Sequence, residues 1–203
     1  MSIRAVKHLS ADPVMSALIQ RVGPIKIKPR RHPPFHSLCQ AIVYQQLSGK
    51  AAGTIFGRFQ ALFEGTAFPT PAQILAQSPE RLRSVGLSRP KTSYILDLAT
   101  RCHAGLVPSL EDCDALTDAE IIERVTEIKG IGRWTAEMLL IFNLGRPDVL
   151  PIHDLGVRRG FQVAYKKRKL PEPERLEAFG VRWAPHRTVA AQYLWAAADA
   201  KTV

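Results

Sequence analysis

The residue with the clearest chemical potential is Asp154, in the segment Pro151-Ile-His-Asp154. It is a single carboxylate in basic surroundings, followed closely by Arg158 and Arg159. Such a carboxylate can stabilise a positive charge that develops on a reacting group, or orient an attacking water. The segment also reads as the start of a helix, so that Asp154 can instead serve as an N-cap or an ion-pair partner.

A second candidate site is the segment from Thr126 to Ala136, in which Gly130 and Gly132 flank Ile131. Apolar residues at helical spacing precede and follow this segment. Two glycines at alternate positions permit backbone dihedrals that are closed to other residues. The first N–H groups of the following helix, together with its dipole, then make a site for a phosphate. The alternative is an ordinary helix–turn–helix corner with a glycine cap.

A third candidate is the glutamine pair Gln45 and Gln46, at the end of a predicted helix over residues 35–46. Ser48 follows directly and is a suitable N-cap for the next predicted helix. Two amides at a corner between helices are polar for a purely structural turn. The pattern fits either a solvated turn or a contact surface.

These candidates lie on a chain whose pattern is helical throughout, with Pro and Gly at the breaks. The predicted helices cover residues 12–22, 35–46, 50–63, 72–77, 79–85, 90–103, 118–128, 133–143, 154–164, 173–183 and 187–200. The stretch Lys26–Pro34 is a basic, proline-stiffened connector, and Lys166–Pro171 is a basic loop. Trp183, at helical spacing from Phe179, is predicted to lie in the core.

Charge is distributed unevenly along the chain, whose formal net charge is +10. Residues 1–63 hold nine Lys/Arg and one acid, and residues 128–203 hold thirteen Lys/Arg and seven acids. The stretch between them holds six Lys/Arg and ten acids. The basic blocks carry all three candidate sites, so we expect a polyanion to lie across a face built from the two ends of the chain.

Composition narrows the class of protein further. With 203 residues, 46% of them hydrophobic, the chain can bury a core as one domain or as two intimate lobes. The sequence shows no apolar run long enough to span a membrane and no secretory leader pattern. Cys39, Cys102 and Cys113 are widely spaced, which favours neither a disulfide framework nor a cysteine-rich metal site. A reducing, intracellular location (the cytoplasm or nucleoid) fits best.

Five motifs, in order, resemble the helix-hairpin-helix DNA glycosylases, and among them the 3-methyladenine DNA glycosylase II (AlkA-type) family. They are QQLS at residues 45–48, GLSRPKTSYILDLA at 86–99, GIGRWTA at 130–136, the PxxD segment at 151–154 and RWAPHRTVAAQYLW at 182–195. The resemblance covers about residues 34–197. Because little sequence precedes residue 34, we expect a compact member that lacks the N-terminal β domain of larger relatives.

The resemblance implies an all-α, two-lobed fold with the active-site cleft between the lobes. Residues 37–145, including the hairpin, would form a central helical lobe, and residues 1–36 plus 146–203 the second lobe of a single glycosylase domain. The implied activity is monofunctional excision of alkylated bases such as 3-methyladenine and 7-methylguanine from double-stranded DNA, by a monomer acting in base excision repair. The base would be flipped out of the duplex and hydrolysed from its sugar, leaving an abasic site.

The resemblance also assigns individual residues. Asp154 matches the catalytic aspartate, and Trp134 and Trp195 match aromatic residues of the base pocket, although packing in the core is the alternative for each tryptophan. Gln46 falls at the position of a side chain that wedges into the duplex, and Gln45 at the neighbour that contacts the flipped site. Tyr44 replaces a small residue found in some members, which puts the shape of the pocket floor and the substrate range in question.

The hairpin is implied to hold DNA and a monovalent cation. The residues assigned to DNA binding there are Gly130, Ile131, Gly132, Arg133 and Thr135. The carbonyls assigned to a structural Na⁺ or K⁺ are those of Thr126, Ile128 and Ile131. No cofactor is expected to be required.

Two further features separate this chain from other relatives. Trp134 stands where bifunctional relatives carry a lysine nucleophile, so strand nicking through a Schiff base is not expected from that position. The last cysteine is Cys113, so the C-terminal iron–sulfur cluster of some relatives is not expected. Two other classes remain open: a non-catalytic helix-hairpin-helix DNA-binding module, and a bifunctional glycosylase/lyase for oxidised bases.

Overall fold

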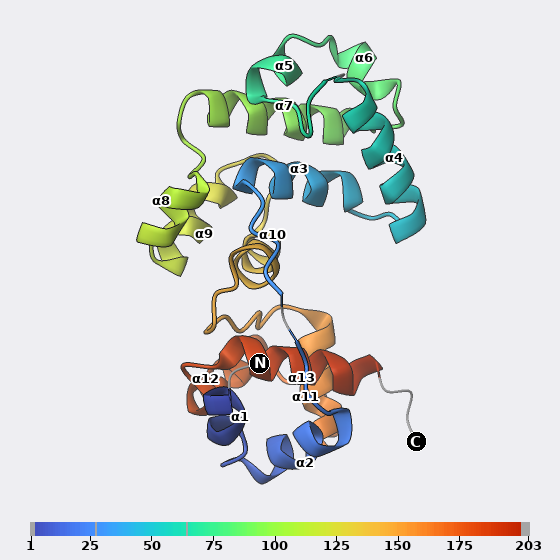
Figure 1. Cartoon of the computed structure of the whole chain (residues 1–203). Coiled ribbons are helices and arrows are strands. Elements are labelled where there is room, and N and C mark those ends of the chain that lie inside the picture. Colours follow the sequence, from blue (N-terminus) through green and yellow to red (C-terminus); the bar gives the residue numbers. More distant parts are fainter. Residues whose placement is uncertain (1–2, 27, 64, 200–203) are drawn as a thin grey trace. The chain divides into compact units, whose positions relative to one another are not determined.

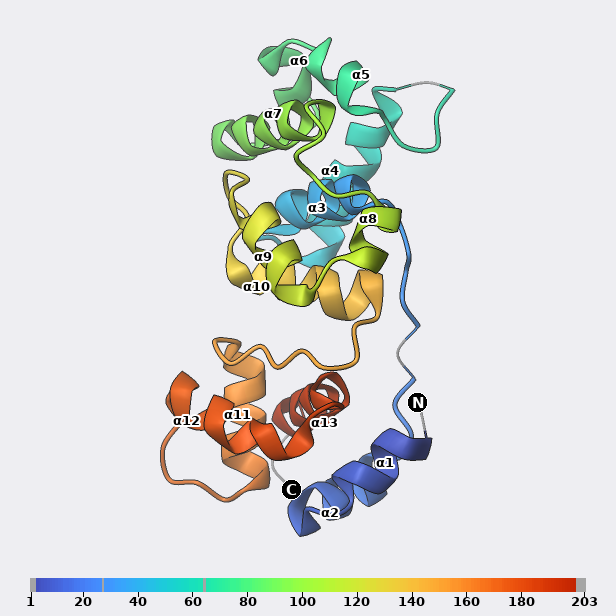
Figure 2. The same ribbon diagram turned by 90° about the vertical axis from the view of Figure 1, so that its left-hand side faces the viewer.

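Many helices of this protein begin directly after a Ser, Thr or Asp residue, whose side chain accepts a hydrogen bond from a backbone N–H of the first turn. The computed structural model describes residues 3–26, 28–63 and 65–199, and Figures 1 and 2 show it from two sides. Within these residues the chain forms thirteen α-helices, one π-helical segment and one 3₁₀ helix, without a β-strand. The all-α prediction is confirmed. None of these helices is long and apolar enough to cross a bilayer.

The chain divides into two compact units. The central unit comprises residues 31–139, and the terminal unit comprises residues 1–30 together with 140–203. The helices of the central unit are α3 (Pro34–Tyr44), α4 (Gly49–Ala61), α5 (Pro71–Leu75), α6 (Pro79–Arg83), α7 (Arg89–His103), α8 (Leu110–Ala115), α9 (Asp118–Thr126) and α10 (Arg133–Met138). Helix α10 continues as the π-helical segment Leu139–Leu144.

Helix α7 is the organising element of the central unit. It packs against α3, α5 and α6, and α3 in turn packs against α4. Ile95, Leu98 and Ala99 of α7 are fully buried, as are Ile42 and Val43 of α3. The opposite edge of α7 is polar, and this edge lies beside the loop between α9 and α10.

The terminal unit is assembled from the two ends of the chain. Its helices are α1 (Ile3–Leu9), α2 (Pro13–Val22), α11 (Leu155–Ala164), α12 (Pro173–Gly180) and α13 (Arg187–Asp199), with the 3₁₀ turn Val181–Trp183 after α12. Helix α13 packs closely along α11 and also against α2. The core of this unit is a cluster of buried side chains that includes Leu9, Met15, Val157, Phe161 and Trp183.

Several sequence expectations can be compared directly with these elements. Trp183 is buried as predicted, at 1% exposure, and Ser48 caps α4 by accepting a hydrogen bond from Ala51 N–H. Helices α1 and α8 were not predicted, and the prediction of helix over 35–46 was two residues too long, because α3 ends at Tyr44. The last residue of the predicted helix 187–200 lies outside the described residues, as does Ile27 of the basic connector.

Candidate active site

Asp154 is the N-cap of α11, and it also contacts a tryptophan. Its Oδ1 accepts a hydrogen bond from Val157 N–H at 2.7 Å and another from Trp195 Nε1–H at 2.7 Å. Two donors converging on one oxygen fix the plane of the carboxylate. The capping interpretation and the chemical interpretation are therefore compatible, because capping uses a single oxygen of the group.

Two glycines of α11 make this contact possible. A Cβ added at Gly156 would lie 2.8 Å from Trp195 Cδ1, and one added at Gly160 would overlap the carbonyl of Leu194. The absence of side chains at these positions, one helical turn apart, lets α11 lie against α13 with the indole edge beside Asp154. Phe142 completes the setting, since its ring stacks on the Trp195 ring with centroids 5.8 Å apart.

The segment that leads to Asp154 is tied to the start of α13. Arg187 binds Asp148 through two hydrogen bonds, Nε to Oδ1 at 2.8 Å and Nη2 to Oδ2 at 2.9 Å. Burial raises the pKa of Asp148, but hydrogen bonds from the Arg187 side chain and backbone, with its charge, outweigh this and leave the pKa below its usual value. The buried Thr188 hydroxyl donates to Arg146 O and accepts from Val149 N–H. These contacts fix the segment before Asp154 to the start of α13, the helix that carries Trp195, and all of them lie within the terminal unit.

The glycine hairpin between α9 and α10 follows the sequence prediction at Gly130, whereas Gly132 has a φ of −96° that other residues also adopt. Gly130 has a φ of +79°, and a Cβ there would overlap the ring of Tyr94 on α7, so that position excludes any side chain on two grounds. Ile131 N–H donates to Ile128 O at 3.0 Å and closes the turn. Gly132 is the N-cap of α10 and supplies no side chain to cover the first N–H groups of that helix.

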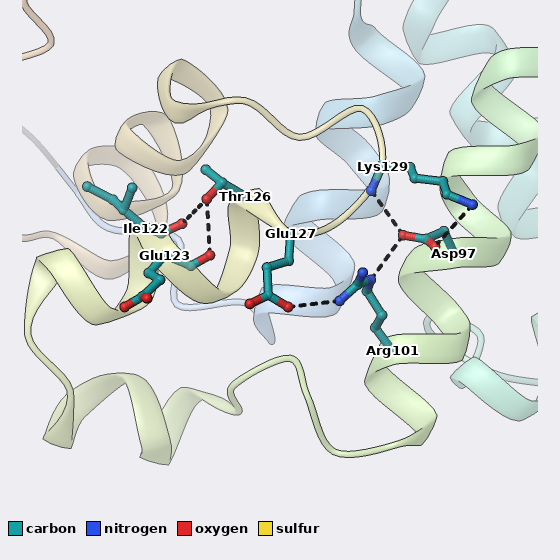
Figure 3. A network of polar contacts seen from close by, with 7 residues as sticks. All are labelled: Asp97, Arg101, Ile122, Glu123, Thr126, Glu127 and Lys129. Carbon is teal, nitrogen blue, oxygen red and sulfur yellow. Dashed lines mark hydrogen bonds and ion pairs between the residues drawn. The ribbon is translucent and has the colours of Figure 1, made fainter.

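A network of charged side chains anchors the hairpin to α7 (Figure 3). Asp97 Oδ2 accepts hydrogen bonds from Lys129 N–H at 2.9 Å and from Arg101 Nε–H at 3.2 Å. Arg101 continues the chain of contacts, since its Nη1 donates to Glu127 Oε2 at 3.0 Å. The hairpin backbone is therefore fixed at Lys129 by a carboxylate that is itself held in place by an arginine.

The glutamine turn after α3 is attached to the same hairpin. Gln45 Nε2 donates to Gly130 O at 2.8 Å, so its amide is engaged with the hairpin backbone. Gln46 is exposed and has a φ of +57°, a conformation uncommon for a residue with a side chain. Lys91 of α7 binds the backbone of this turn, with Nζ donating to Val43 O at 2.7 Å and to Gln45 O at 2.6 Å. Burial lowers the pKa of Lys91.

The remaining predicted residues of the central unit differ in their exposure. Trp134 is 50% exposed on α10, and Tyr44 is 37% exposed, with its ring edge against Phe56 of α4. Arg133 is exposed, and its Nε donates to the buried carboxylate of Glu137 at 3.0 Å. Thr135 is buried, at 8% exposure.

Comparison with known proteins shows the family of this chain. The model of the HhH-GPD superfamily of base excision DNA repair proteins matches residues 39–186. The chain belongs to this superfamily. The match includes the glutamine turn, the hairpin and Asp154.

Individual HhH-GPD relatives are similar over nearly the whole chain. DNA-3-methyladenine glycosylase 1 of Schizosaccharomyces pombe is 40% identical over 197 residues, which cover 95% of this chain and 86% of the relative. The structure of the 3-methyladenine DNA glycosylase of that yeast in complex with abasic DNA superposes with a TM-score of 0.83 at 39% identity, covering 95% of each chain. A DNA-3-methyladenine glycosidase from Bacillus halodurans superposes with a TM-score of 0.88 at 37% identity, covering 98% of this chain and 90% of the other.

The structure adds residues that sequence reasoning did not assign in this HhH-GPD chain. They are Lys91, Tyr94 and Asp97 of α7, which seat the turn and the hairpin, and Gly156, which admits Trp195 to Asp154. A signal was available for the first three, because polar or aromatic residues recur every three positions along one edge of a helix. Gly156 carried no such signal, since its role depends on a side chain 39 residues away.

Proposed function

We propose that this protein is a monofunctional DNA glycosylase that hydrolyses the N-glycosyl bond of alkylated bases in double-stranded DNA. The observation that carries the proposal is the carboxylate of Asp154, oriented by Val157 and Trp195, in a chain 40% identical to a DNA-3-methyladenine glycosylase. The products are the free base and an abasic site. The protein acts as a monomer on 3-methyladenine and 7-methylguanine.

The chemistry of the substrate explains why a single carboxylate suffices. A purine methylated at N3 or N7 carries a formal positive charge and leaves as a neutral base, so protonation by a general acid contributes little. As the bond breaks, positive charge builds on the sugar, and Asp154 stabilises that oxocarbenium-like state or orients the water that attacks it. An indole face is the most favourable aromatic surface for the cationic base, and Trp195, hydrogen-bonded to Asp154, is proposed to offer one. The match of Trp134 to the family motif supports the same kind of contact for that residue.

The central unit provides the proposed contacts with the DNA backbone and the duplex. The N–H groups at the start of α10, next to the bare Gly132, bind a backbone phosphate without reading the bases. Gln46 enters the duplex and fills the space that the extruded nucleotide leaves. Its exposure and its positive φ support this role, because strained and exposed turn residues often act in binding.

A monovalent cation at the hairpin is part of the proposal. The carbonyls of Thr126, Ile128 and Ile131 are neutral oxygen donors of the kind that Na⁺ and K⁺ accept. Ile128 O accepts one hydrogen bond, from Ile131 N–H, and a carbonyl oxygen has a second lone pair for an ion. The positive charge of the ion would reduce the repulsion between these carbonyl oxygens and an approaching phosphate. The reaction itself needs neither this ion nor an iron–sulfur cluster.

One experiment tests the activity against its alternatives. The purified protein is incubated with genomic DNA treated with a methylating agent, and released bases and strand breaks are measured. Free methylpurines without breaks are the expected result. DNA binding without base release would show a non-catalytic binding module and overturn the proposal. Breaks that form before alkali treatment would show a glycosylase/lyase and overturn its monofunctional part.

A further inference from the structure

One edge of α7 carries side chains that contact both proposed DNA-binding elements of the central unit. Lys91, Tyr94, Asp97 and Arg101 recur every three or four residues and therefore share a face of the helix. We call these four residues the anchor edge. At one end it meets the turn that bears Gln46, and at the other it meets the hairpin.

Lys91 supplies hydrogen bonds to carbonyl oxygens at the C-terminal end of α3. The last carbonyls of a helix have no partners within it, and a cation placed there is favoured by the helix dipole. Lys91 Nζ donates to two such oxygens, those of Val43 and Gln45, at 2.7 and 2.6 Å. The second of these belongs to the residue directly before Gln46. The ammonium group therefore fixes the peptide unit from which the Gln46 side chain projects.

The hairpin end of the anchor edge is equally well defined. The Tyr94 ring lies in the space that a side chain at residue 130 would need, and Asp97 accepts a hydrogen bond from Lys129 N–H. The two ends are also linked directly, since Gln45 Nε2 donates to Gly130 O at 2.8 Å. The turn and the hairpin are thus connected by one route through α7 and by a second route through Gln45.

We propose that the anchor edge of α7 sets the spacing between the hairpin phosphate site and the Gln46 wedge, with Lys91 as the positioning residue for the wedge. The proposal rests on the function proposed above. When the hairpin holds the DNA backbone, this spacing determines which base step Gln46 reaches. Backbone binding and extrusion of the damaged nucleotide are then coupled through a rigid helix rather than through the DNA alone.

The test uses Lys91→Met, which keeps most of the side-chain length and removes the ammonium, and Lys91→Arg, which retains a donor group. Lys50→Met is the matched control, because it removes an exposed lysine of α4 close to the same turn. Each variant is assayed in single turnover on 7-methylguanine paired with cytosine and on the same lesion in a one-nucleotide bulge. Affinity for undamaged duplex and the melting temperature are measured alongside.

Lys91→Met is expected to slow excision of the paired lesion about five- to thirtyfold more than excision of the bulged lesion, the size of a loss of roughly 1–2 kcal/mol in extrusion. Affinity for undamaged duplex should change less than twofold, Lys91→Arg should recover part of the rate, and Lys50→Met should leave the ratio unchanged. In a Gln46→Ala background, Lys91→Met should no longer alter the ratio, because the wedge is already absent.

Other outcomes would overturn the proposal. Equal losses on both lesions would show a general structural role for Lys91, and a uniform fall in duplex affinity with a shallower salt dependence would show a phosphate contact. Additive effects of Lys91→Met and Gln46→Ala would show that the two residues act independently. If the unmodified protein released no methylpurine from either substrate, the proposed function would fail instead.

Discussion

At the scale of single residues, the N-cap position of Asp154 is compatible with its proposed chemical role, although sequence reasoning treats the two as alternatives. Its Oδ1 caps α11 and receives the Trp195 indole N–H, while the charge belongs to the whole carboxylate. The cap therefore orients the group in addition to stabilising the helix. This arrangement allows the two roles to be separated by substitution, because an amide can cap a helix but carries no charge.

Replacement of Asp154 by Asn should remove catalysis and leave the fold intact. The amide oxygen can still accept from Val157 N–H and Trp195 Nε1–H, so the free energy of unfolding should change by less than about 1 kcal/mol. Base release should fall by several orders of magnitude, since the charge that stabilises the developing cation is gone. Single-turnover excision, duplex affinity and thermal unfolding check this. Wild-type excision by Asp154→Asn would refute the catalytic assignment.

Trp195 and Trp134 should respond differently to substitution, because the Trp195 indole N–H donates to Asp154 Oδ1 whereas the Trp134 ring is half-exposed. Trp195→Phe keeps a ring and loses one charge-assisted hydrogen bond, so excision should fall about ten- to hundredfold on charged and neutral bases alike. Trp134→Ala, at a half-exposed ring, should reduce release of cationic 7-methylguanine about two- to thirtyfold more than release of neutral hypoxanthine. Melting curves for both variants identify any loss of folding. If Trp195→Phe selectively reduced release of 7-methylguanine and Trp134→Ala reduced release of both bases alike, the assignments of the two tryptophans would be exchanged.

At the scale of elements, most helices could be predicted and several contacts between them could not. Glycine, proline and capping residues mark the helix boundaries locally, which is why most of the predicted ranges overlap observed helices. Helices α1 and α8 are only seven and six residues long, too short for a periodic apolar signal, although Ser109 and Asp112 form a capping box that marks the second. Lys91 binds the Gln45 carbonyl just after α3, and it is 46 residues from Gln45 in sequence, so local reasoning does not reveal this contact.

In the candidate site, too, some residues could be predicted from the sequence and the contacts that support them could not. Asp154, the hairpin glycines and the glutamine pair were recognisable because short motifs carry them. Their supporting contacts were not, since Gln45 with Gly130 and Trp195 with Asp154 are separated by 85 and 41 residues. The sequence alone also placed Gln45 in the base pocket, whereas the structure shows its amide bound to the hairpin. That residue's contact with a flipped base stays a prediction.

The two hairpin glycines should differ in their tolerance of alanine. Gly130→Ala meets both a positive φ and the Tyr94 ring, so it should lower the free energy of unfolding by about 1–3 kcal/mol and weaken duplex binding with it. Gly132 has a φ of −96° and open space around its Cβ direction, so Gly132→Ala should cost about 1 kcal/mol or less. It should still weaken binding to damaged and undamaged duplex, because the added methyl group obstructs the phosphate. Urea unfolding and duplex titration measure both effects, and unchanged binding by Gly132→Ala would argue against a phosphate site there.

At the scale of the whole molecule, formal charge divides between the units. The terminal unit holds 17 Lys/Arg against 7 acids, and the central unit holds 11 of each, so the former accounts for the entire net charge of +10. Most basic residues of the two end blocks therefore lie in the terminal unit, whereas residues 31–63 and 128–139 of these blocks belong to the central unit. The hairpin, in contrast, lies in a unit of zero net charge, so its proposed contact with a phosphate depends on directed N–H groups rather than on a general field.

Salt dependence should reflect this division. Replacing Lys167 and Lys169 of the exposed loop after α11 by Gln should lower affinity for any duplex and reduce the slope of log affinity against log salt by about 1 per lost contact. Replacing Arg81 and Arg83 of α6 by Gln removes the same charge from the neutral central unit and should change the slope less. Discrimination between damaged and undamaged duplex should be unaffected in both. Equal slope changes for the two pairs would show that the division of charge has no bearing on binding.

The assembly of the terminal unit from both chain ends has a consequence for biosynthesis. Tyr193 on α13 donates to Gly23 O at the end of α2, across 170 residues of sequence. At about 5–20 residues per second, a ribosome needs roughly 10–30 s to translate that interval, during which α1 and α2 have no partner helices to cover their apolar faces. The central unit, encoded as one continuous stretch, can complete its fold in that time. The Asp154–Trp195 contact forms only after α13 has emerged, so the nascent chain can form its hairpin and glutamine turn before Asp154 is oriented by Trp195.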